Sequence, residues 1–388
     1  MFTVSVSTSP TNASRYFAQH LCQDEYYSEQ AAIRGEWHGR LVSDLGLSAD
    51  QPVDAENFRK LCQGKHPATD ESLAVRLHAN RRALFDFTAS APKTVSIMAL
   101  LAGDTRLIEA HREAVQVALA SVESSAAARV RKGSACDSQD FRSTGQIATA
   151  CFLHRESRAL DPQLHTHCIV FNATFDPVEH RFKALESRAM FAALQKCTQT
   201  YRTRLTANIR KLGYRVALDD KGCPVIAGVP AALEERFSKR AIDTKAAIAE
   251  AEKSTGKTLS KKAVAAMFRA HRRDKQTLSP EAIHKHQQSQ LSPVERQSLV
   301  ALRHAAETRA AQPSFTVAPV RVTTAVPWLA MVRGAMTVAR TLQFDAHLFS
   351  IDHPVRDRVY RAIPYLRYVT TIQRLRSATR SAAKGSSR

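Results

Sequence analysis

The chain has 388 residues, which is enough for two or three domains, and with 44% hydrophobic and 24% charged residues it has an ordinary globular composition. Its 56 Lys and Arg against 36 Asp and Glu give a net charge of +20, which calls for a polyanionic partner such as nucleic acid or an anionic membrane surface. The seven cysteines are scattered without any C-x-x-C, which argues against a disulfide framework and against a thiolate zinc site.

In chain order, residues 12–62 have the spacing of short helices and loops, including DAENFRKLCQG with its glycine stop. In the segment ALFDFTAS, residues 83–90, apolar and other side chains alternate enough to predict a strand. A helix is expected directly after it, in SAPKTVSIMALLAG, with Ser90 as the cap and Pro92 near the first turn.

The middle of the chain predicts a long helix and then two strands. Residues 104–132 have apolar side chains at intervals of three and four, and this helix is expected to end in the basic cluster Arg129, Arg131 and Lys132. STGQIATACFLHRE and QLHTHCIVFNATF follow as strands joined by a polar connection, so we expect them to form a hairpin.

The second half of the chain begins with helical and hairpin patterns and ends in a basic tail. Residues 187–214 predict a helix stopped at Gly213, residues 214–228 a short hairpin about an Asp-Lys-Gly turn, and residues 231–290 a basic helical region. Beyond Ala301 there are 14 Lys and Arg against 4 Asp and Glu. This excess fits either a solvated basic face or a non-specific nucleic-acid contact.

Three parts are expected along the chain: a domain at 1–295, a linker at 296–327, and a basic C-terminal segment at 328–388. Residues 311–327 of the linker are rich in Pro, Thr and Val and lack a helical period. The N-terminal MFTVSVSTSP lacks the basic start and apolar core of a signal peptide, and Arg333 and Arg340 interrupt the most apolar later segment. We therefore expect a cytoplasmic protein without membrane insertion.

The first candidate site is a pair of histidines near the start of the second predicted hairpin strand. Side chains alternate along a strand, so His165 and His167 project to one face while Thr166 and Cys168 project to the other. His154 closes the preceding strand, and an antiparallel hairpin brings it to the other two.

Three imidazoles with open coordination positions are typical of a catalytic metal site, although an H-x-H pattern also fits hydrogen-bonded core or surface histidines. Nitrogen ligands suit manganese, zinc or nickel better than magnesium, which prefers oxygen. A cation held there could polarise a phosphodiester and neutralise developing charge.

A nucleophile for such a site is available among Tyr16, Tyr26 and Tyr27. Tyrosine attacks poorly at its usual pKa of about 10. A metal-polarised phosphate or a carboxylate that accepts its proton makes it competent. The alternative is that these rings are amphipathic packing residues.

Three ordered segments resemble the relaxase domain of TraI/TrwC-type (MobF) conjugative relaxases, which belong to the HUH endonuclease superfamily. These are the N-terminal tyrosines before GEWHGRLVSDLGL, then FDFTASAPKTVSIMALLAG, and then HRESRALDPQLHTHCIVFNATF. The resemblance runs from about Tyr16 to Thr277. It implies an α+β fold with a central antiparallel β-sheet and flanking helices, followed by a helical segment and the basic tail.

The resemblance also implies roles for residues. The metal ligands would be His154, His165 and His167. Asp86 would orient a ligand histidine and help to take the tyrosine proton.

Tyr16 matches the first catalytic tyrosine and Tyr26 the second, although in one unbroken helix Tyr27 would share a face with Tyr16. Arg158 matches an arginine that could bind phosphate through two hydrogen bonds, with a surface ion pair as the alternative. Other basic candidates for DNA contacts are Arg81, Arg82, Lys93, Arg131 and Lys132.

The implied function is nicking and rejoining of one DNA strand at an origin of transfer through a 5′-phosphotyrosine, with a divalent ion of manganese, magnesium or zinc. The implied partners are single-stranded DNA with the origin-of-transfer hairpin, accessory nicking proteins, a coupling protein and a helicase in trans. A helicase motif is not expected in this chain, because AEKSTGKT has Ala251 where a phosphate-binding loop needs its first glycine.

Two rival functions stay open on the sequence. The first is a DNA-binding module that kept the fold and lost its nicking activity. The second is a metal-dependent hydrolase of a small molecule, which explains the net charge of +20 poorly.

Overall fold

The protein's structure is a computed structural model that describes residues 2–7, 9–11, 35–74, 81–130, 140–256, 258–260, 263–264, 266–267 and 278–312. The chain divides into two compact units, residues 1–320 and 321–388, and every described residue belongs to the first. No helix in the described part of the chain is long and apolar enough to cross a membrane.

Five antiparallel strands form the central sheet in the order β1-β3-β7-β6-β2. Their bounds are Phe2–Ser7 (β1), Glu36–His38 (β2), Leu84–Ser90 (β3), Thr149–Glu156 (β6) and Pro162–Phe171 (β7). The predicted strand at 83–90 and the predicted hairpin, β6–β7, are confirmed. The two edge strands were not predicted. Strand β2 has only three residues, and in β1, at the chain end, an alternation of polar and apolar side chains is weak evidence by itself.

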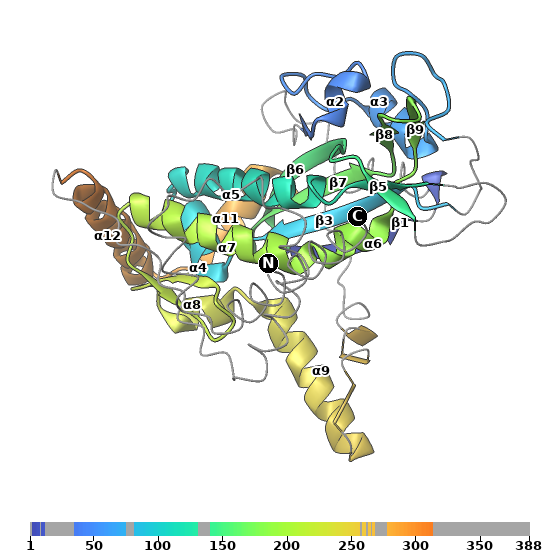
Figure 1. The fold of residues 1–388 in the computed structure, drawn as a ribbon. Coiled ribbons are helices and arrows are strands. Elements are labelled where there is room, and N and C mark those ends of the chain that lie inside the picture. The colour runs from blue at the N-terminus through green and yellow to red at the C-terminus, as the bar shows by residue number, and fades with distance from the viewer. Residues whose placement is uncertain are drawn as a thin grey trace, which may run out of the picture. The chain divides into compact units, whose positions relative to one another are not determined.

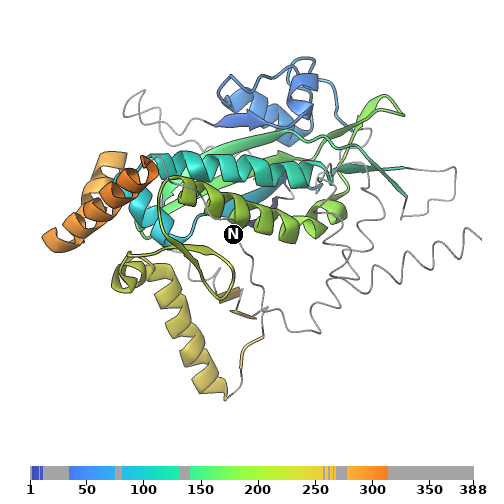
Figure 2. The ribbon, with the colours of Figure 1, turned by 60° about the vertical axis from the view of Figure 1, so that its left-hand side comes forward.

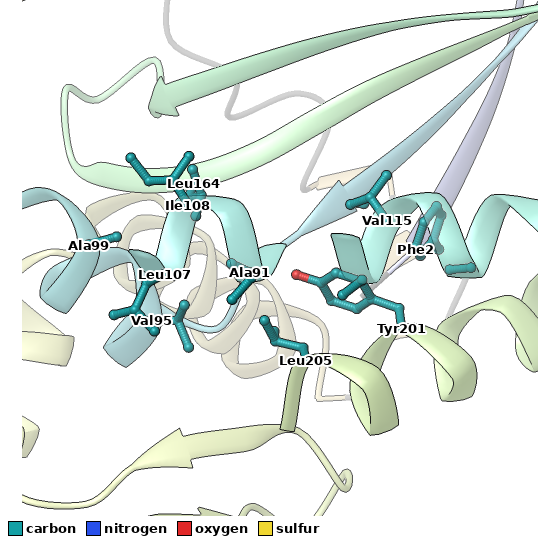
Figure 3. Packing of buried hydrophobic residues seen from close by; sticks show 14 of the residues in the cluster. Phe2, Ala91, Val95, Ala99, Leu107, Ile108, Val115, Leu164, Tyr201 and Leu205 are labelled. Carbon is teal, nitrogen blue, oxygen red and sulfur yellow. The ribbon is translucent and has the colours of Figure 1, made fainter. Parts of the chain in front are cut away.

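Three helices cover one face of the sheet, which we call the helix-covered face: α4 (Lys93–Leu100), α5 (Arg106–Glu123) and α7 (Leu194–Lys211). Figures 1 and 2 show α5 and α7 side by side along this face. The apolar stripe of α5 is buried against strand residues such as Phe85, Leu164 and Val170. Figure 3 shows part of this core.

Two described helices pack on the opposite face, which we call the second face. Helices α2 (Leu41–Asp44) and α3 (Ala55–Gln63) pack there over a core that includes Phe152 and Phe171. Helix α3 begins where the Asp54 carboxylate accepts the Asn57 backbone N–H at 2.8 Å. Since this core takes up one end of the face, the other end is left for polar side chains.

The remaining described elements are short ribbons and helices. The ribbon strands are β4 (Ala127–Arg129), β5 (Phe141–Ser143), β8 (Thr174–Asp176), β9 (Arg181–Lys183), β10 (Val216–Leu218) and β11 (Pro224–Ile226). The helices are α6 (Ser187–Ala192), α8 (Ala231–Arg236), α9 (Lys239–Thr255), α11 (Pro280–Ser289) and α12 (Pro293–Ala310). The predicted hairpin at 214–228 is β10–β11, and the predicted helix at 187–214 is divided into α6 and α7.

Two local predictions were wrong. Ser90 does not cap α4, because it is the last residue of β3, and Pro92 occupies the N-cap position instead. The long helix ends at Glu123 rather than in the basic cluster. Arg129 lies in β4, where its guanidinium pairs with the Glu186 carboxylate at 2.7 Å, because strand pairing with β5 overrides local helical propensity.

The predicted boundary at residue 295 falls inside α12. Residues 296–310, expected to belong to a linker, are helical and bury Leu299 and Ala306 in the main core. The capping box of Ser292 and Glu295 begins this helix, and Glu295 also pairs with Arg236 at 2.9 Å. The rest of the predicted linker and the segment 328–388 lie outside the described residues, and their division stays a prediction.

We expect Gly213→Ala to lower the free energy of unfolding by about 3 kcal/mol, because the packing of α12 depends on this glycine. Gly213 ends α7 with a φ of +86°, and a Cβ there would lie 2.0 Å from the Ala306 carbonyl oxygen. Urea denaturation measures the loss. Gly222→Ala is the matched control, because its φ is +71° but nothing lies within 4 Å of its Cβ position, so only about 1 kcal/mol should be lost. Equal losses in the two variants would contradict the packing of α12 described above.

Candidate metal centre and active site

The three predicted histidines come together on the second face of the sheet. His154 of β6 lies directly across from His165 of β7, and His167 follows two residues later on the same face. The ring centroids are separated by 5.2 Å for His154–His165 and by 5.3 Å for the two other pairs. The imidazoles therefore form a nearly equilateral triangle.

The size of this triangle suits a transition-metal ion. A point equidistant from the centroids lies about 3 Å from each, which leaves room for the roughly 2.1 Å bond from an imidazole nitrogen to the ion. As the side chains stand, no group of three or more His, Cys, Asp or Glu among the described residues meets the full geometry of a metal site.

Hydrogen bonds at Nδ1 select the tautomer of two of the rings. His165 Nδ1 donates to the Gln163 carbonyl oxygen at 2.8 Å, and His167 Nδ1 donates to the Asp86 carboxylate at 2.9 and 3.0 Å. Each of these rings then keeps the lone pair of its Nε2, which is the form that binds a metal. Burial, and to a smaller extent the neighbouring His167, lowers the pKa of His165 to about 4. Its ring is therefore neutral at neutral pH.

Asp86 makes the contact that the resemblance implied. It lies on β3, the neighbour of β7, and its side chain is buried on the same face as the histidines. Thr88, two residues along β3, donates from its hydroxyl to Asp86 Oδ1 at 3.1 Å and lies 3.2 Å from His167 Nδ1. Thr88 was not predicted as a site residue. The signal was present in FDFTAS, because residues two apart in a strand, such as Asp86 and Thr88, project to the same face.

Cys168 faces away from the cluster, as predicted. It lies directly across from Cys151 on the helix-covered face, and both thiols are buried. Burial, and to a smaller extent the hydrogen bond with Cys151, raises the pKa of Cys168, so this sulfur stays protonated. It is not available as a fourth ligand.

The predicted nucleophiles lie outside the described residues. Tyr16, Tyr26 and Tyr27 all fall within residues 12–34. Arg131 and Lys132 are likewise outside, within residues 131–139. The roles given to these five residues stay predictions.

Lys93 has a structural contact that its predicted DNA-binding role did not include. Its ammonium donates to the Pro162 carbonyl oxygen at 2.9 Å, under the start of β7. Burial lowers the pKa of Lys93 to about 8, while Asp161 acts in the opposite direction. The side chain therefore helps to hold the turn between β6 and β7.

Two of the other basic candidates lie away from the cluster. Arg81 donates to the Cys62 carbonyl oxygen at 2.9 Å, and Arg82 donates to the Ser187 hydroxyl. Both arginines come just before the first residue of β3, which pairs with Phe171. The histidine cluster lies near the last residue of β3, which pairs with His165. They cannot contact a phosphate held at the histidines, and a contact with DNA elsewhere stays a prediction.

Arg158 lies in the turn between β6 and β7 and is half-buried. This turn joins the two strands that carry the histidines, so the predicted phosphate contact is compatible with its position in the chain. The role itself stays a prediction.

The chain matches the model of the TrwC relaxase family over residues 10–294. Among solved structures, it resembles the conjugative relaxase TrwC in complex with oriT DNA in a metal-bound form, with 29% identity, a TM-score of 0.64, and coverage of 77% of this chain and 98% of that one. A copper-bound TrwC–oriT complex gives a TM-score of 0.65, and a complex with a 27-mer DNA comprising the recognition hairpin and the cleavage site gives 0.63.

The described domain thus has the relaxase fold. The chain belongs to the TrwC relaxase family. It is also 32% identical over 292 residues to the multifunctional conjugation protein TraI of Escherichia coli K12, covering 72% of this chain. It spans only 15% of the length of that relative, so the match alone does not assign the activities of full-length TraI to this chain.

Proposed function

We propose that this protein nicks and rejoins one DNA strand at an origin of transfer, and so initiates the conjugative mobilisation of a plasmid or another element. Family membership and the oriT complexes of TrwC support this proposal. The single observation that carries it in this chain is the triangle of His154, His165 and His167 with Asp86 hydrogen-bonded to one corner.

In this proposal the three imidazoles hold one divalent ion. When bound, the ion polarises the scissile phosphodiester and offsets the negative charge that develops on it. Nitrogen ligands favour manganese or zinc over magnesium, and the metal-bound and copper-bound forms of TrwC support a divalent cofactor. Asp86 keeps His167 in the tautomer that leaves Nε2 as the ligand atom.

The nucleophile in this proposal is Tyr16. Its phenolic oxygen forms a new bond to the phosphorus while the bond to the 3′-oxygen breaks, and the tyrosine proton is passed on, with Asp86 as one acceptor. The ester bond is exchanged rather than hydrolysed, so no ATP is consumed and the strand can be rejoined. A second tyrosine, Tyr26 or Tyr27, provides a second strand transfer.

The proposed partners are single-stranded DNA and the origin-of-transfer hairpin. The +20 charge and the TrwC complexes with hairpin DNA support them. Accessory nicking proteins, a coupling protein and a helicase in trans complete the proposal, which places the reaction in the cytoplasm because the DNA substrate is there.

The test is a covalent adduct assay that depends on the metal. Labelled single-stranded oligonucleotides from the DNA next to the protein's own gene are incubated with the full chain and Mn²⁺ and separated on a denaturing gel. We expect a band shifted by the mass of the protein, absent after chelation with EDTA and restored by added Mn²⁺. DNA binding without a covalent species at every site and with every metal would favour the DNA-binding module that has lost its nicking activity.

A further inference from the structure

A chain of three buried polar side chains lies directly behind the histidine cluster. Thr166 stands between His165 and His167 in β7, so its side chain points to the helix-covered face. Its Oγ1 lies 2.9 Å from His111 Nε2 on α5, and His111 Nδ1 lies 2.7 Å from the Tyr201 hydroxyl on α7. The proposed function uses none of the three side chains in this hydrogen-bond chain.

All three side chains of the hydrogen-bond chain are buried, and Tyr201 lies in the apolar core. His111 and Tyr201 are 0% exposed and Thr166 is 5% exposed. Figure 3 shows Tyr201 reaching from α7 into the apolar layer near Phe2, and the two rings make an edge contact with centroids 5.6 Å apart. Polar groups in such a layer are costly unless each finds a partner, so the three side chains stabilise the fold only as a connected set.

Both ring systems are neutral. Burial lowers the pKa of His111 to about 3 and raises the pKa of Tyr201 above its ordinary value. A neutral imidazole has one N–H and one lone pair, so His111 links its two neighbours through both nitrogens, whichever one carries the proton. The result is an uncharged connection from two helices to a single residue of β7.

We propose that Thr166, His111 and Tyr201 are positioning residues that hold His165 and His167 in the geometry needed to bind an ion, an inference that rests on the proposed metal site. Thr166 shares a peptide unit with each of these two histidines, and its β-branched side chain has a restricted χ1. Tying its hydroxyl to α5 therefore fixes the backbone that carries both ligands.

The position of the hydrogen-bond chain distinguishes it from ordinary core packing. Elsewhere on the helix-covered side of β7, Leu164 and Val170 are buried among apolar residues, and such contacts have no preferred direction. On the second face, Asp86 holds His167 through its ring. Directional hydrogen bonds thus reach β7 from both sides of the sheet, at the adjacent residues Thr166 and His167.

The test measures metal binding by the full-length protein, not activity. Mn²⁺ affinity is determined by calorimetry and the ligand geometry by Cu²⁺ EPR, for the wild type, Thr166→Val, Thr166→Ser and Tyr201→Phe. We expect Thr166→Val, which keeps the shape but removes the hydroxyl, to weaken Mn²⁺ binding about tenfold and to shift the EPR spectrum. Thr166→Ser should retain both properties, and Tyr201→Phe should show a smaller loss of about threefold.

Two controls separate the possible failures. Val170→Ala removes buried carbons from the same face of the same strand, and it should lower stability without changing the affinity or the spectrum. Binding by Thr166→Val that equals the wild type, or an equal loss in Val170→Ala, would overturn the positioning role. If wild-type binding is no stronger than that of His165→Ala, the proposed metal site itself is wrong.

Discussion

Replacing Tyr16 with phenylalanine is expected to abolish the covalent protein–DNA product, with a loss of at least about 10³-fold in the rate of its formation. The substitution removes one oxygen atom, which in the proposed mechanism forms the bond to phosphorus. The ring is kept, so the affinity for DNA should change little. The measurement is the initial rate of adduct formation on the denaturing gel, with DNA affinity measured separately.

Tyr26→Phe and Tyr27→Phe are the matched controls, because each removes the same atom from a nearby tyrosine. Both should form the first adduct at close to the wild-type rate, and the one that carries the second nucleophile should lose only the second strand transfer. A metal-dependent hydrolase would behave differently, because attack by water leaves its activity intact in Tyr16→Phe. Retained cleavage in that variant would therefore reject the tyrosine mechanism.

Replacing His165 with alanine is expected to remove metal binding and, with it, adduct formation. One of the three imidazoles is lost, and the remaining two cannot fill the ligand positions, so Mn²⁺ affinity should fall by at least about 100-fold. Asp86→Asn should have a smaller effect, about 10- to 100-fold, because it disturbs the orientation of His167 without removing a ligand. Calorimetry with Mn²⁺ checks both values.

His284→Ala is the matched control for this prediction, because His284 lies exposed on α11. It should bind Mn²⁺ and form the adduct like the wild type. Raising the Mn²⁺ concentration should restore metal occupancy in Asp86→Asn but not in His165→Ala. If His165→Ala binds Mn²⁺ as tightly as the wild type, the histidine triangle is not the metal site.

Much of the candidate site could be predicted from local pattern. The two-residue period of a strand placed His165 and His167 on one face, and the expected hairpin brought His154 across from them. Asp86 was different, because it contacts His167 from 81 residues away and no local pattern indicates that pairing. Its role came from the family resemblance. Thr88 and the hydrogen-bond chain of Thr166, His111 and Tyr201 were not predicted.

The misassigned elements share a physical cause. The stretch around Arg129 has a helical pattern, yet β4 forms there because β5 and a bridge from Leu185 supply its partners. Helix α12 was placed in a linker, yet it closes against Gly213 at the end of α7. In both places, contacts with distant segments decide the structure, and their energy exceeds the small differences in local propensity.

By itself the sequence determined the basic charge, the strands and helices with strong local periodicity, and the shared face of the two neighbouring histidines. Only the tertiary structure decided that β3 pairs with β7 on its other side, so that Asp86 and Thr88 reach the histidines on one face while His111 and Tyr201 support Thr166 from the other. The physical reason is that periodicity follows from the local geometry of the chain. Which distant segments become neighbours depends instead on how the whole core packs.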